Sequence, residues 1–254
     1  MAEKMRLGGI LDLSTVDWYG NASLIVFFAG CNFRCPYCQN SPLIPPDSGV
    51  EVGVEVLKER IEKNLILLDA VVFTGGEPTL QPEGVEEAAR AVRDYELKLM
   101  LDTNGSIPNV IERLLSEDLI DRVALDVKAP LRGEVYGRVI GLPEAGTSMA
   151  RRVEESLELC NQYGVEVEVR TTVAPGISDD PDFIREIARS IRGRCTVYYL
   201  QQFDNTGNVL DESLKALEPP TRERMMELGR IALEEGVEEV YIKTRRHGLE
   251  RVQP

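Results

Sequence analysis

Short runs of β-branched and other apolar residues alternate along the chain with longer stretches in which apolar residues recur every three or four positions. The short runs predict buried strands, and the longer stretches predict helices with one apolar side. The expected strands are 24–29, 70–74, 98–101, 122–126, 166–173, 196–201 and 240–244, with a further strand near the start at 9–13. The expected helices are 52–64, 82–94, 108–116, 148–163, 181–191 and 222–235. Ser148 is the expected cap of its helix.

This alternation predicts an α/β fold with a parallel sheet and helices packed outside it. About six strand–helix units can be counted, fewer than the eight of a closed barrel, so we expect a partial (β/α)6 TIM-like barrel. No linker rich in Ser, Gly or Pro divides the series. Residues 1–254 are therefore expected to form a single domain, with a C-terminal helix and strand at 222–244.

The chain carries a formal net charge of −14, which limits the partners to expect. An acidic surface repels nucleic acid unless basic residues gather on one face. Arg245, Arg246 and Arg251 form the visible basic cluster, and a solvated tail is the simpler interpretation of it. No run is long and apolar enough to span a bilayer, and residues 1–7 lack the apolar segment of a signal peptide. We expect a cytoplasmic protein without a nucleic-acid or membrane partner.

Three of the five cysteines, Cys31, Cys35 and Cys38, lie within eight residues after the strand expected at 24–29. Loops after strand C-termini are where parallel barrels gather their active groups. Clustered cysteines in a cytosolic protein indicate a metal or redox site rather than disulfides. Three thiolates can hold three corners of an iron–sulfur cubane and leave one iron open to another ligand. Cys160 and Cys195 are expected to be buried as small apolar residues.

A structural zinc site made of these cysteines and His247, the single histidine, is the alternative. His247 stands in a polar stretch among arginines, where an exposed side chain without a metal is the simpler interpretation. The sequence therefore favours the cluster, and iron spectroscopy distinguishes the two.

The spacing Cys31-x3-Cys35-x-Tyr37-Cys38 resembles the signature of the radical S-adenosylmethionine (SAM) superfamily. The resemblance implies a barrel of the radical SAM type, a [4Fe–4S] cluster held by the three cysteines, and SAM bound to the open iron near Tyr37. In that superfamily an electron from the cluster cleaves SAM to a 5′-deoxyadenosyl radical, which takes a hydrogen atom from the substrate. The radical is carried by SAM, so no side chain is assigned a catalytic role.

Gly75, Gly76, Glu77 and Pro78 follow the strand expected at 70–74. Two glycines allow a ligand to approach the backbone closely, and a carboxylate accepts hydrogen bonds from an ammonium group. A tight turn between strand and helix would use the same residues. The segment resembles the GGEP motif of radical SAM enzymes, which implies that it binds the amino group of SAM.

Charged residues also end the next two strands, in the segments Asp102-Thr103-Asn104-Gly105 and Asp126-Val127-Lys128. Two carboxylates at one mouth repel each other unless a cation or the donors of a ligand lie between them. Turn chemistry is the alternative for 102–105. Both segments resemble those of glycyl-radical-enzyme activases, which implies that Asp102, Thr103, Asn104 and Asp126 lie around SAM close to a monovalent cation. By the same resemblance Lys128 contacts SAM, and Arg170 on the fifth strand lies near it.

From about residue 15 to residue 207 the sequence resembles these activases, most closely the activating proteins of anaerobic ribonucleoside-triphosphate reductase. Three departures put the particular substrate in doubt. They are Val16-Asp17-Trp18-Tyr19-Gly20 in place of a VDGPG-type stretch, Gln39 in place of a common histidine, and Phe203-Asp204 in place of a tyrosine–histidine pair.

The sequence thus predicts an activase that forms a glycyl radical on a partner such as anaerobic ribonucleotide reductase, with a flavodoxin- or ferredoxin-type electron donor. The segment 129–147, with Arg132, Tyr136 and Arg138, is a candidate for part of the partner surface, and a solvated connection is the alternative. A radical SAM enzyme acting on a small molecule, nucleotide or RNA is the second hypothesis. A non-catalytic metal-binding module is the third.

Overall fold

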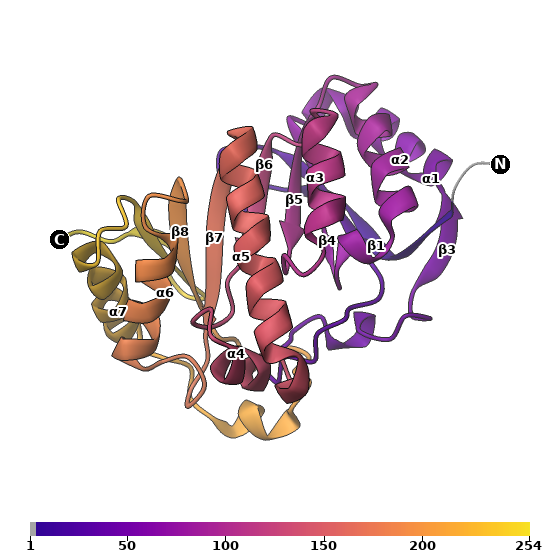
Figure 1. The fold of residues 1–254 in the computed structure, drawn as a ribbon. Coiled ribbons are helices and arrows are strands. Elements are labelled where there is room, and N and C mark those ends of the chain that lie inside the picture. The colour runs from indigo at the N-terminus through magenta and orange to yellow at the C-terminus, as the bar shows by residue number, and fades with distance from the viewer. Residues whose placement is uncertain (1–3) are drawn as a thin grey trace.

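The computed structural model describes residues 4–254, whose ten strands form one sheet in the order β10-β9-β8-β7-β6-β5-β4-β2-β1-β3 (Figure 1). From β2 to β9 every neighbouring pair is parallel, whereas β1 pairs antiparallel with β2 and β3, and β10 pairs antiparallel with β9. The strands are β1 Lys4–Ser14, β2 Ser23–Phe28, β3 Val50–Gly53, β4 Ala70–Gly75, β5 Lys98–Thr103, β6 Arg122–Asp126, β7 Glu166–Val173, β8 Val197–Gln202, β9 Val240–Thr244 and β10 Gly248–Arg251.

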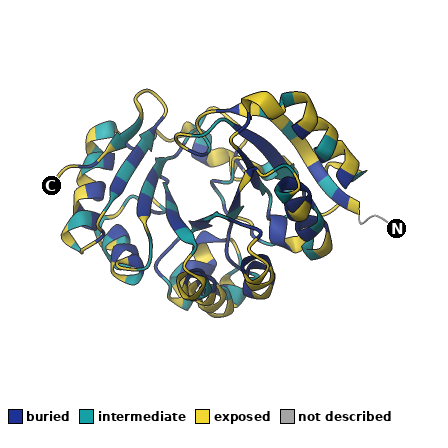
Figure 2. Ribbon diagram, turned by 90° about the horizontal axis from the view of Figure 1, so that it is seen from above, coloured by how far each residue is buried: buried dark blue, intermediate teal, exposed yellow. Residues whose placement is uncertain are grey.

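Helices lie on the outer side of the curved sheet, as Figure 2 shows from above. They are α1 Val54–Asn64, α2 Pro82–Arg93, α3 Pro108–Ser116, α4 Gly133–Val139, α5 Gly146–Tyr163, α6 Pro181–Ile191 and α7 Arg222–Glu234. α6 shows why these segments are helical: Asp180 caps its first turn, Pro181 follows, and Ile184, Ile187 and Ile191 form a buried stripe. The curvature and the uncovered inner face make the fold a partial TIM-like barrel, as the alternating pattern predicts.

Alternate residues of the parallel strands divide the core in two. One set, such as Val71 on β4 and Leu99 on β5, packs with the helices. The other set forms a smaller inner cluster of Trp18, Ile25, Ala70, Val72, Met100 and Ala124. Arg122 lies 5.6 Å from the ring centre of Trp18, so the aromatic ring packs beneath a charged group inside the barrel. The inner face is therefore mainly apolar at β2, β4 and β5, and charged residues gather on it at β6 and β7 and at Asp102 near the end of β5.

The structure corrects several expectations at the two ends of the sheet. β1 covers residues 4–14 rather than 9–13, and residues 50–53, which include the first positions of the helix expected at 52–64, form the edge strand β3. Arg251 lies in β10, so the C-terminal residues form a hairpin with β9 instead of a solvated tail. These antiparallel additions are short or rich in glycine and charge, which hides their alternating pattern in the sequence.

Two corrections concern the segment before β7. Helix α5 begins at Gly146, and Ser148 does not cap it, because its hydroxyl lies inside the first turn and donates to Ala145 O at 2.8 Å. Gly146 packs so tightly on Gly133 and Gly137 that a Cβ there would overlap them. The preceding stretch also contains helix α4, where a loop was expected. Between residues 4 and 254, no helix is long and apolar enough to cross a membrane.

Candidate functional site

The three clustered cysteines lie in the loop after β2, here called the cluster loop (residues 30–40), at the C-terminal end of the parallel strands. Their thiols line one cavity together with residues from the ends of β4, β5, β6 and β7. Cys35 is buried, Cys31 and Cys38 are half-buried, and all three are free thiols. The sequence prediction that the chemistry gathers at the strand ends matches this arrangement.

The cluster loop is held from several sides by hydrogen bonds to its backbone and side chains. Gly30 N donates to Leu43 O at 2.7 Å, and Arg34 N donates to Ile140 O, just after α4, at 2.8 Å. The Asn40 amide donates to Gly75 O at the end of β4 at 3.0 Å. Phe33 is buried edge-to-face against Tyr136 of α4, with ring centres 6.5 Å apart. These contacts fix the positions of the thiols before any ligand binds.

Burial makes the thiols weak acids. It raises the pKa of Cys31 to about 11 and that of Cys35 to about 12, with Lys128 acting in the opposite direction. Cys38 is shifted the same way, because burial raises its pKa. Iron binding to such thiols displaces their protons, so the protein supplies a protected site whose charge is balanced by the metal.

The zinc alternative finds no support in the geometry. His247 lies in the turn between β9 and β10, where it lines a separate depression with Arg245 and Arg246. Nowhere in residues 4–254 do three His, Cys, Asp or Glu side chains converge as around a single metal ion. The thiols instead surround a shared space, which suits a cubane because the cluster is larger than one ion.

Gly75 and Gly76 are required by the close packing of the backbone around them. Gly75 has a φ of +117°, and a Cβ on either residue would overlap the backbone of the segment 27–30 where it enters the cluster loop. Gly76 N donates to Phe28 O, and Glu77 N donates to Gly30 O, each at 2.8 Å. Both glycines also line the cavity. The motif therefore joins the end of β4 to the cluster loop at close range.

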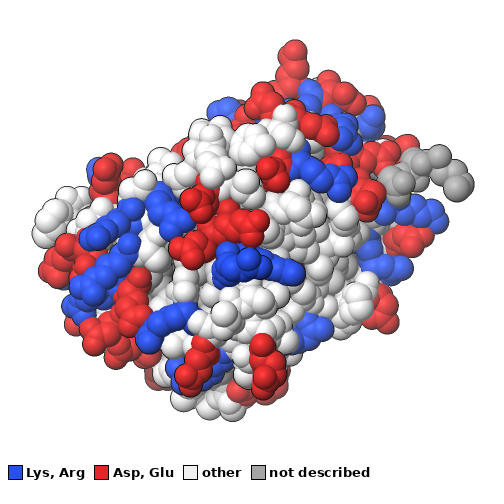
Figure 3. Space-filling model, in the orientation of Figure 1, with Lys and Arg blue, Asp and Glu red and all other residues white. Residues whose placement is uncertain are grey.

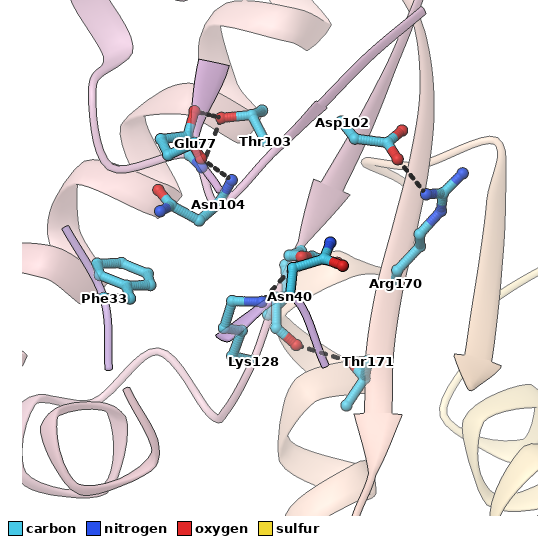
Figure 4. A network of polar contacts seen from close by, with 12 residues as sticks. Phe33, Asn40, Glu77, Asp102, Thr103, Asn104, Lys128, Arg170 and Thr171 are labelled. Atoms are coloured by element: carbon cyan, nitrogen blue, oxygen red, sulfur yellow. Dashed lines mark hydrogen bonds and ion pairs between the residues drawn. The ribbon is translucent and has the colours of Figure 1, made fainter. Parts of the chain in front are cut away.

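Glu77 is fully buried, and its carboxylate accepts hydrogen bonds from four groups of the same chain. Oε1 accepts from Thr79 N at 3.1 Å, from Thr79 Oγ1 at 2.6 Å and from Thr103 Oγ1 at 2.7 Å. Oε2 accepts from Asn104 N at 2.7 Å, as Figure 4 shows. Burial raises the pKa of Glu77, and these donors act against that shift. The side chain ties β4 to the end of β5 and, like Pro78, does not line the cavity.

Asp102 lies largely buried on the cavity side, where Arg170 of β7 reaches it (Figure 4). Arg170 Nη1 lies 2.8 Å from Asp102 Oδ2, and Arg170 also pairs with Glu168. Burial raises the pKa of Asp102 to about 6, although the charge of Arg170 acts in the opposite direction. Asp102 Oδ1 is buried without a hydrogen-bond partner among residues 4–254. Such an atom is costly to bury, so it marks a position where a ligand or ion would fit.

Asp126 and Lys128 form a second pair beside the thiols. Lys128 Nζ lies 2.8 Å from Asp126 Oδ2. Burial opposes the charge of Lys128, but Asp126 and the neighbouring Cys35 outweigh it and raise the pKa of Lys128 well above its usual value. The hydroxyl of Tyr37 is also buried, without a hydrogen-bond partner in the described part of the chain. The cavity thus offers a fixed ammonium group and an acidic side within one chamber.

Most of the residues expected at the site come together. The cavity is lined by Cys31, Cys35, Tyr37, Cys38, Gly75, Gly76, Asp102, Thr103, Asn104, Asp126, Lys128 and Arg170. Sequence reasoning missed five further lining residues, which are Phe33, Gln39, Asn40, Thr74 and Thr172. Thr74 and Thr172 are polar residues at the ends of expected strands, a signal that could have found them. Phe33 and Asn40 carry no such signal.

Two of the departures from the activase pattern lie in contact. Gln39 of the cluster loop donates its side-chain amide to Asp204 O at 3.0 Å. The Asp204 carboxylate accepts from Thr206 N and Oγ1, which lower its pKa. In the third departure, Trp18 fills the inner core, and Asp17 O accepts from Arg170 at 3.3 Å. The altered positions at 39 and 204 form one linked edge of the site.

The segment 129–147 does not form the exposed loop expected for a partner surface. Tyr136 is fully buried on α4, where it supports Phe33, so it is wrong to place this side chain at a surface. Arg132 and Arg138 are exposed, and Arg132 pairs with Glu186 of α6. The segment therefore packs against the cluster loop through Tyr136 and also reaches the surface at Arg132 and Arg138.

The fold and the thiol-lined cavity define a radical SAM protein, and the family comparison agrees: residues 25–187 match the model of the radical SAM superfamily. A Methanocaldococcus jannaschii protein, provisionally named a glycyl-radical enzyme activating enzyme, is 36% identical over 95% of this chain and 97% of its own length. The pyruvate formate-lyase 1-activating enzyme of Escherichia coli is 33% identical over 74% of this chain and 75% of its own. The chain belongs to the glycyl-radical enzyme activating family of radical SAM enzymes.

A solved structure supports the fold. A radical SAM methyltransferase from Sphaerobacter thermophilus superposes with a TM-score of 0.71 at 17% identity, over 90% of this chain and 68% of its own. The superfamily implies a [4Fe–4S] cluster and SAM as cofactors. The donor set fits them, because three cysteines with free thiols, Lys128 and Asp102, which has one carboxylate oxygen without a partner in the described residues, line one cavity.

Proposed function

We propose that this enzyme generates a glycyl radical on a partner protein. The observation that carries the proposal is the single cavity in which three thiols meet the charged ends of β5, β6 and β7. When bound, the cluster and SAM supply the electron transfer and the 5′-deoxyadenosyl radical that takes a hydrogen atom. The chain's own residues bind, orient and enclose these groups.

The roles we assign follow from charge and position. Cys31, Cys35 and Cys38 ligate iron. Lys128, held 2.8 Å from Asp126, is placed to bind the carboxylate of SAM, and Arg170 fixes Asp102 on the opposite side. Tyr37, Gly75, Gly76, Thr103 and Asn104 complete the wall around SAM. Glu77 and Pro78 act from behind that wall, by holding the ends of β4 and β5 in register.

A monovalent cation is proposed between Asp102 and Asp126. The support is Asp102 Oδ1, which is buried without a hydrogen-bond partner in the described residues, and the raised pKa of Asp102, which burial causes first and the charges of Glu168 and Asp126 increase further. A cation there would relieve both costs. Arg170 is shared between Asp102 and Glu168, so its charge offsets that of Asp102 only in part.

For the partner we propose an anaerobic ribonucleotide reductase, on the resemblance of residues 15–207 to the activating proteins of that enzyme. A flavodoxin- or ferredoxin-type protein is proposed as the electron donor. Nucleic acid is not proposed, because the net charge is −14 and acidic and basic side chains are interspersed on the face in Figure 3. We also propose that the chain works as a single domain in the cytoplasm, since one sheet joins all ten strands and the cysteines are free thiols.

The test is anaerobic reconstitution with iron, sulfide, SAM and dithionite, in the presence of an anaerobic ribonucleotide reductase. We expect 5′-deoxyadenosine and a glycyl radical signal by electron paramagnetic resonance (EPR). Formation of 5′-deoxyadenosine without the protein radical would reject the partner and favour a small-molecule, nucleotide or RNA substrate.

A matched pair of cysteine variants tests the cluster assignment. Cys35→Ala should abolish iron–sulfur absorbance and SAM cleavage, because it removes a buried ligand. Cys195→Ala, a half-buried cysteine outside the loop, should retain both. Cleavage retained in Cys35→Ala would contradict the assignment.

A further inference from the structure

Asn104, the residue after β5, touches the cluster loop with its side chain. Its amide nitrogen Nδ2 lies 3.9 Å from Cys31 Sγ and donates to Asn32 Oδ1 at 3.0 Å. Asn104 is 4% exposed, so most of the residue is shielded from solvent. A buried N–H group directed at a cysteine sulfur is a donor that acts on whatever that sulfur binds.

The orientation of this amide is fixed by its other contacts. Asn104 Oδ1 accepts from Ser106 N at 2.9 Å, and a backbone N–H can only donate. The oxygen therefore faces Ser106, and the two N–H groups must face Asn32 and Cys31. Asn32 in turn donates to Ser106 Oγ at 2.8 Å, which closes a small ring of hydrogen bonds.

The backbone at Asn104 is equally constrained. Its N–H donates to the buried Glu77 carboxylate at 2.7 Å, and Gly105 N donates to Thr103 Oγ1 at 3.1 Å. Ser156 of α5 donates to Gly105 O at 2.7 Å. The position of the amide is thus set by β4 and α5, and in Figure 4 Asn104 lies between Glu77 and Phe33.

Among the three cysteines, Cys31 is the one with such a side-chain donor in residues 4–254. Cys31 Sγ also accepts a hydrogen bond from Phe33 N at 3.4 Å. An iron–sulfur cluster gains negative charge when reduced, part of it on the ligating sulfurs, so donors to sulfur stabilise the reduced state more than the oxidised state. Two donors on one sulfur make that corner the easiest place to hold added charge.

We propose that Asn104 is a positioning residue that donates a hydrogen bond to the sulfur of Cys31 and thereby raises the reduction potential of the bound cluster. This role rests on ligation of the cluster by Cys31 but not on the identity of the partner protein. It gives Asn104 a role toward the cluster, through Cys31 of the cluster loop, in addition to its place in the wall of the SAM cavity.

The test compares midpoint potentials of reconstituted proteins by EPR-monitored redox titration. Asn104→Ala should shift the midpoint to a more negative value, so that the ratio of reduced to oxidised cluster at the wild-type midpoint falls roughly three- to tenfold. Asn104→Asp keeps the shape, removes the donor and adds negative charge, so it should shift the midpoint at least as far. It also serves as the second variant where alanine impairs folding.

Asn32→Ala is the matched control, because it loosens the same ring of hydrogen bonds and leaves the donor to sulfur in place. Its midpoint should move less than twofold in the same ratio. An unchanged midpoint in both Asn104 variants, or an equal shift in Asn32→Ala, would overturn the proposal. Neither measurement needs the partner, so a failure here differs from a failure to form the glycyl radical.

Discussion

Two buried carboxylates at the ends of neighbouring strands have opposite surroundings. Glu77, after β4, receives four hydrogen bonds from its own chain, and its oxygens do not reach the cavity. Asp102, near the end of β5, accepts a hydrogen bond from Arg170 on one oxygen and, within the part of the chain that the structure describes, none on the other. Both are charged residues of expected binding motifs, yet one is satisfied by the fold and the other is left open. The difference separates a carboxylate whose hydrogen-bond donors come from the chain from one that keeps an oxygen without a donor in residues 4–254.

The cost of burial explains why this difference is informative. A buried carboxylate without partners is destabilising, so a chain that folds around one either satisfies it internally or leaves it to a ligand. Burial raises the pKa of both residues, which shows that each is held against a cost. Only at Glu77 do four donors from the chain offset it.

Replacing Glu77 tests the satisfied region and should have the largest effect. In Glu77→Gln the new amide would place an N–H group against Asn104 N–H or against the Thr79 and Thr103 donors. We expect a loss of about 2–3 kcal/mol in the free energy of unfolding, since a buried group without a partner costs about 1–3 kcal/mol. This corresponds to a fall in Tm of roughly 4–12 °C for a domain of this size.

The control for this change is Glu83→Gln, an exposed residue in the first turn of α2. Its Tm should stay within about 1 °C of the parent, because surface substitutions change stability by about 0.5 kcal/mol or less. Equal Tm values for Glu77→Gln and the parent would show that the four hydrogen bonds do not stabilise the fold.

Replacing Asp102 tests the open region, and here the effect should fall on binding. In Asp102→Asn the shape is kept and Arg170 retains Glu168, so we expect a change of less than about 1 kcal/mol in unfolding. The affinity for SAM should fall about tenfold, which equals 1.4 kcal/mol. Isothermal titration with the reconstituted protein measures it, and Asp12→Asn, which breaks the surface pair with Arg60, is the control. A stability loss as large as that of Glu77→Gln would remove the distinction between the two carboxylates.

The sequence predicted the parallel part of the sheet and most of the cavity, and the reason is visible at Asp102 and Asp126. A parallel barrel brings strand C-termini together, so polar residues that follow apolar runs must meet. The contacts of Glu77 were not predictable, because its four hydrogen bonds come from residues 79, 103 and 104, and no sequence pattern shows that these donors meet it. Direction of a side chain, into the cavity or behind it, is set by packing and not by the motif.

Helix α4 and the burial of Tyr136 escaped prediction for a related reason. The helix is seven residues long and contains two glycines, so its periodicity is too short to detect. The glycines are needed because Gly133 and Gly137 lie against Thr147, Pro143 and Gly146. Tyr136 is the one aromatic residue of the segment 129–147, and its partner Phe33 lies about a hundred residues earlier. Contacts at that separation leave no local pattern.

Proton binding offers a finer test of the open carboxylate. Burial raises the pKa of Asp102 from 3.8 to about 6, so the folded state holds this proton more tightly than the unfolded chain. Its contribution to stability is full below about pH 4 and is lost as the pH rises through about 6. A cation at Asp102 acts in the opposite sense, because it needs the ionised form.

The rise in Tm caused by adding potassium chloride, compared with a matched tetramethylammonium salt, should therefore grow from about pH 5 to about pH 7.5. The expected gain is a few degrees, since a ligand at ten times its Kd contributes about 1.4 kcal/mol. Asp102→Asn should show no pH-dependent difference between the salts. A potassium effect that persists in that variant would place the cation elsewhere.

Tyr136 gives the smallest effect and the strictest test of the comparison. Its hydroxyl, like Asp102 Oδ1, is buried without a well-formed hydrogen bond in residues 4–254, but it is neutral, and the backbone N–H of Lys128 lies close enough to act on it. A neutral buried atom does not attract a charged ligand. Tyr136→Phe should therefore remove only the energetic cost of burying the hydroxyl. We expect the free energy of unfolding to rise by up to about 1 kcal/mol, because a buried hydroxyl without a hydrogen-bond partner is unfavourable. SAM affinity should not change.

Tyr198→Phe is the matched control, because its buried hydroxyl donates to Thr171 Oγ1 at 2.9 Å, and its loss should destabilise the fold by about 1 kcal/mol. Opposite signs for the two tyrosines, measured by denaturant unfolding, would show that partners found in the chain determine the cost of burial. The same sign for both would remove the physical basis for treating Asp102 Oδ1 as an open ligand position.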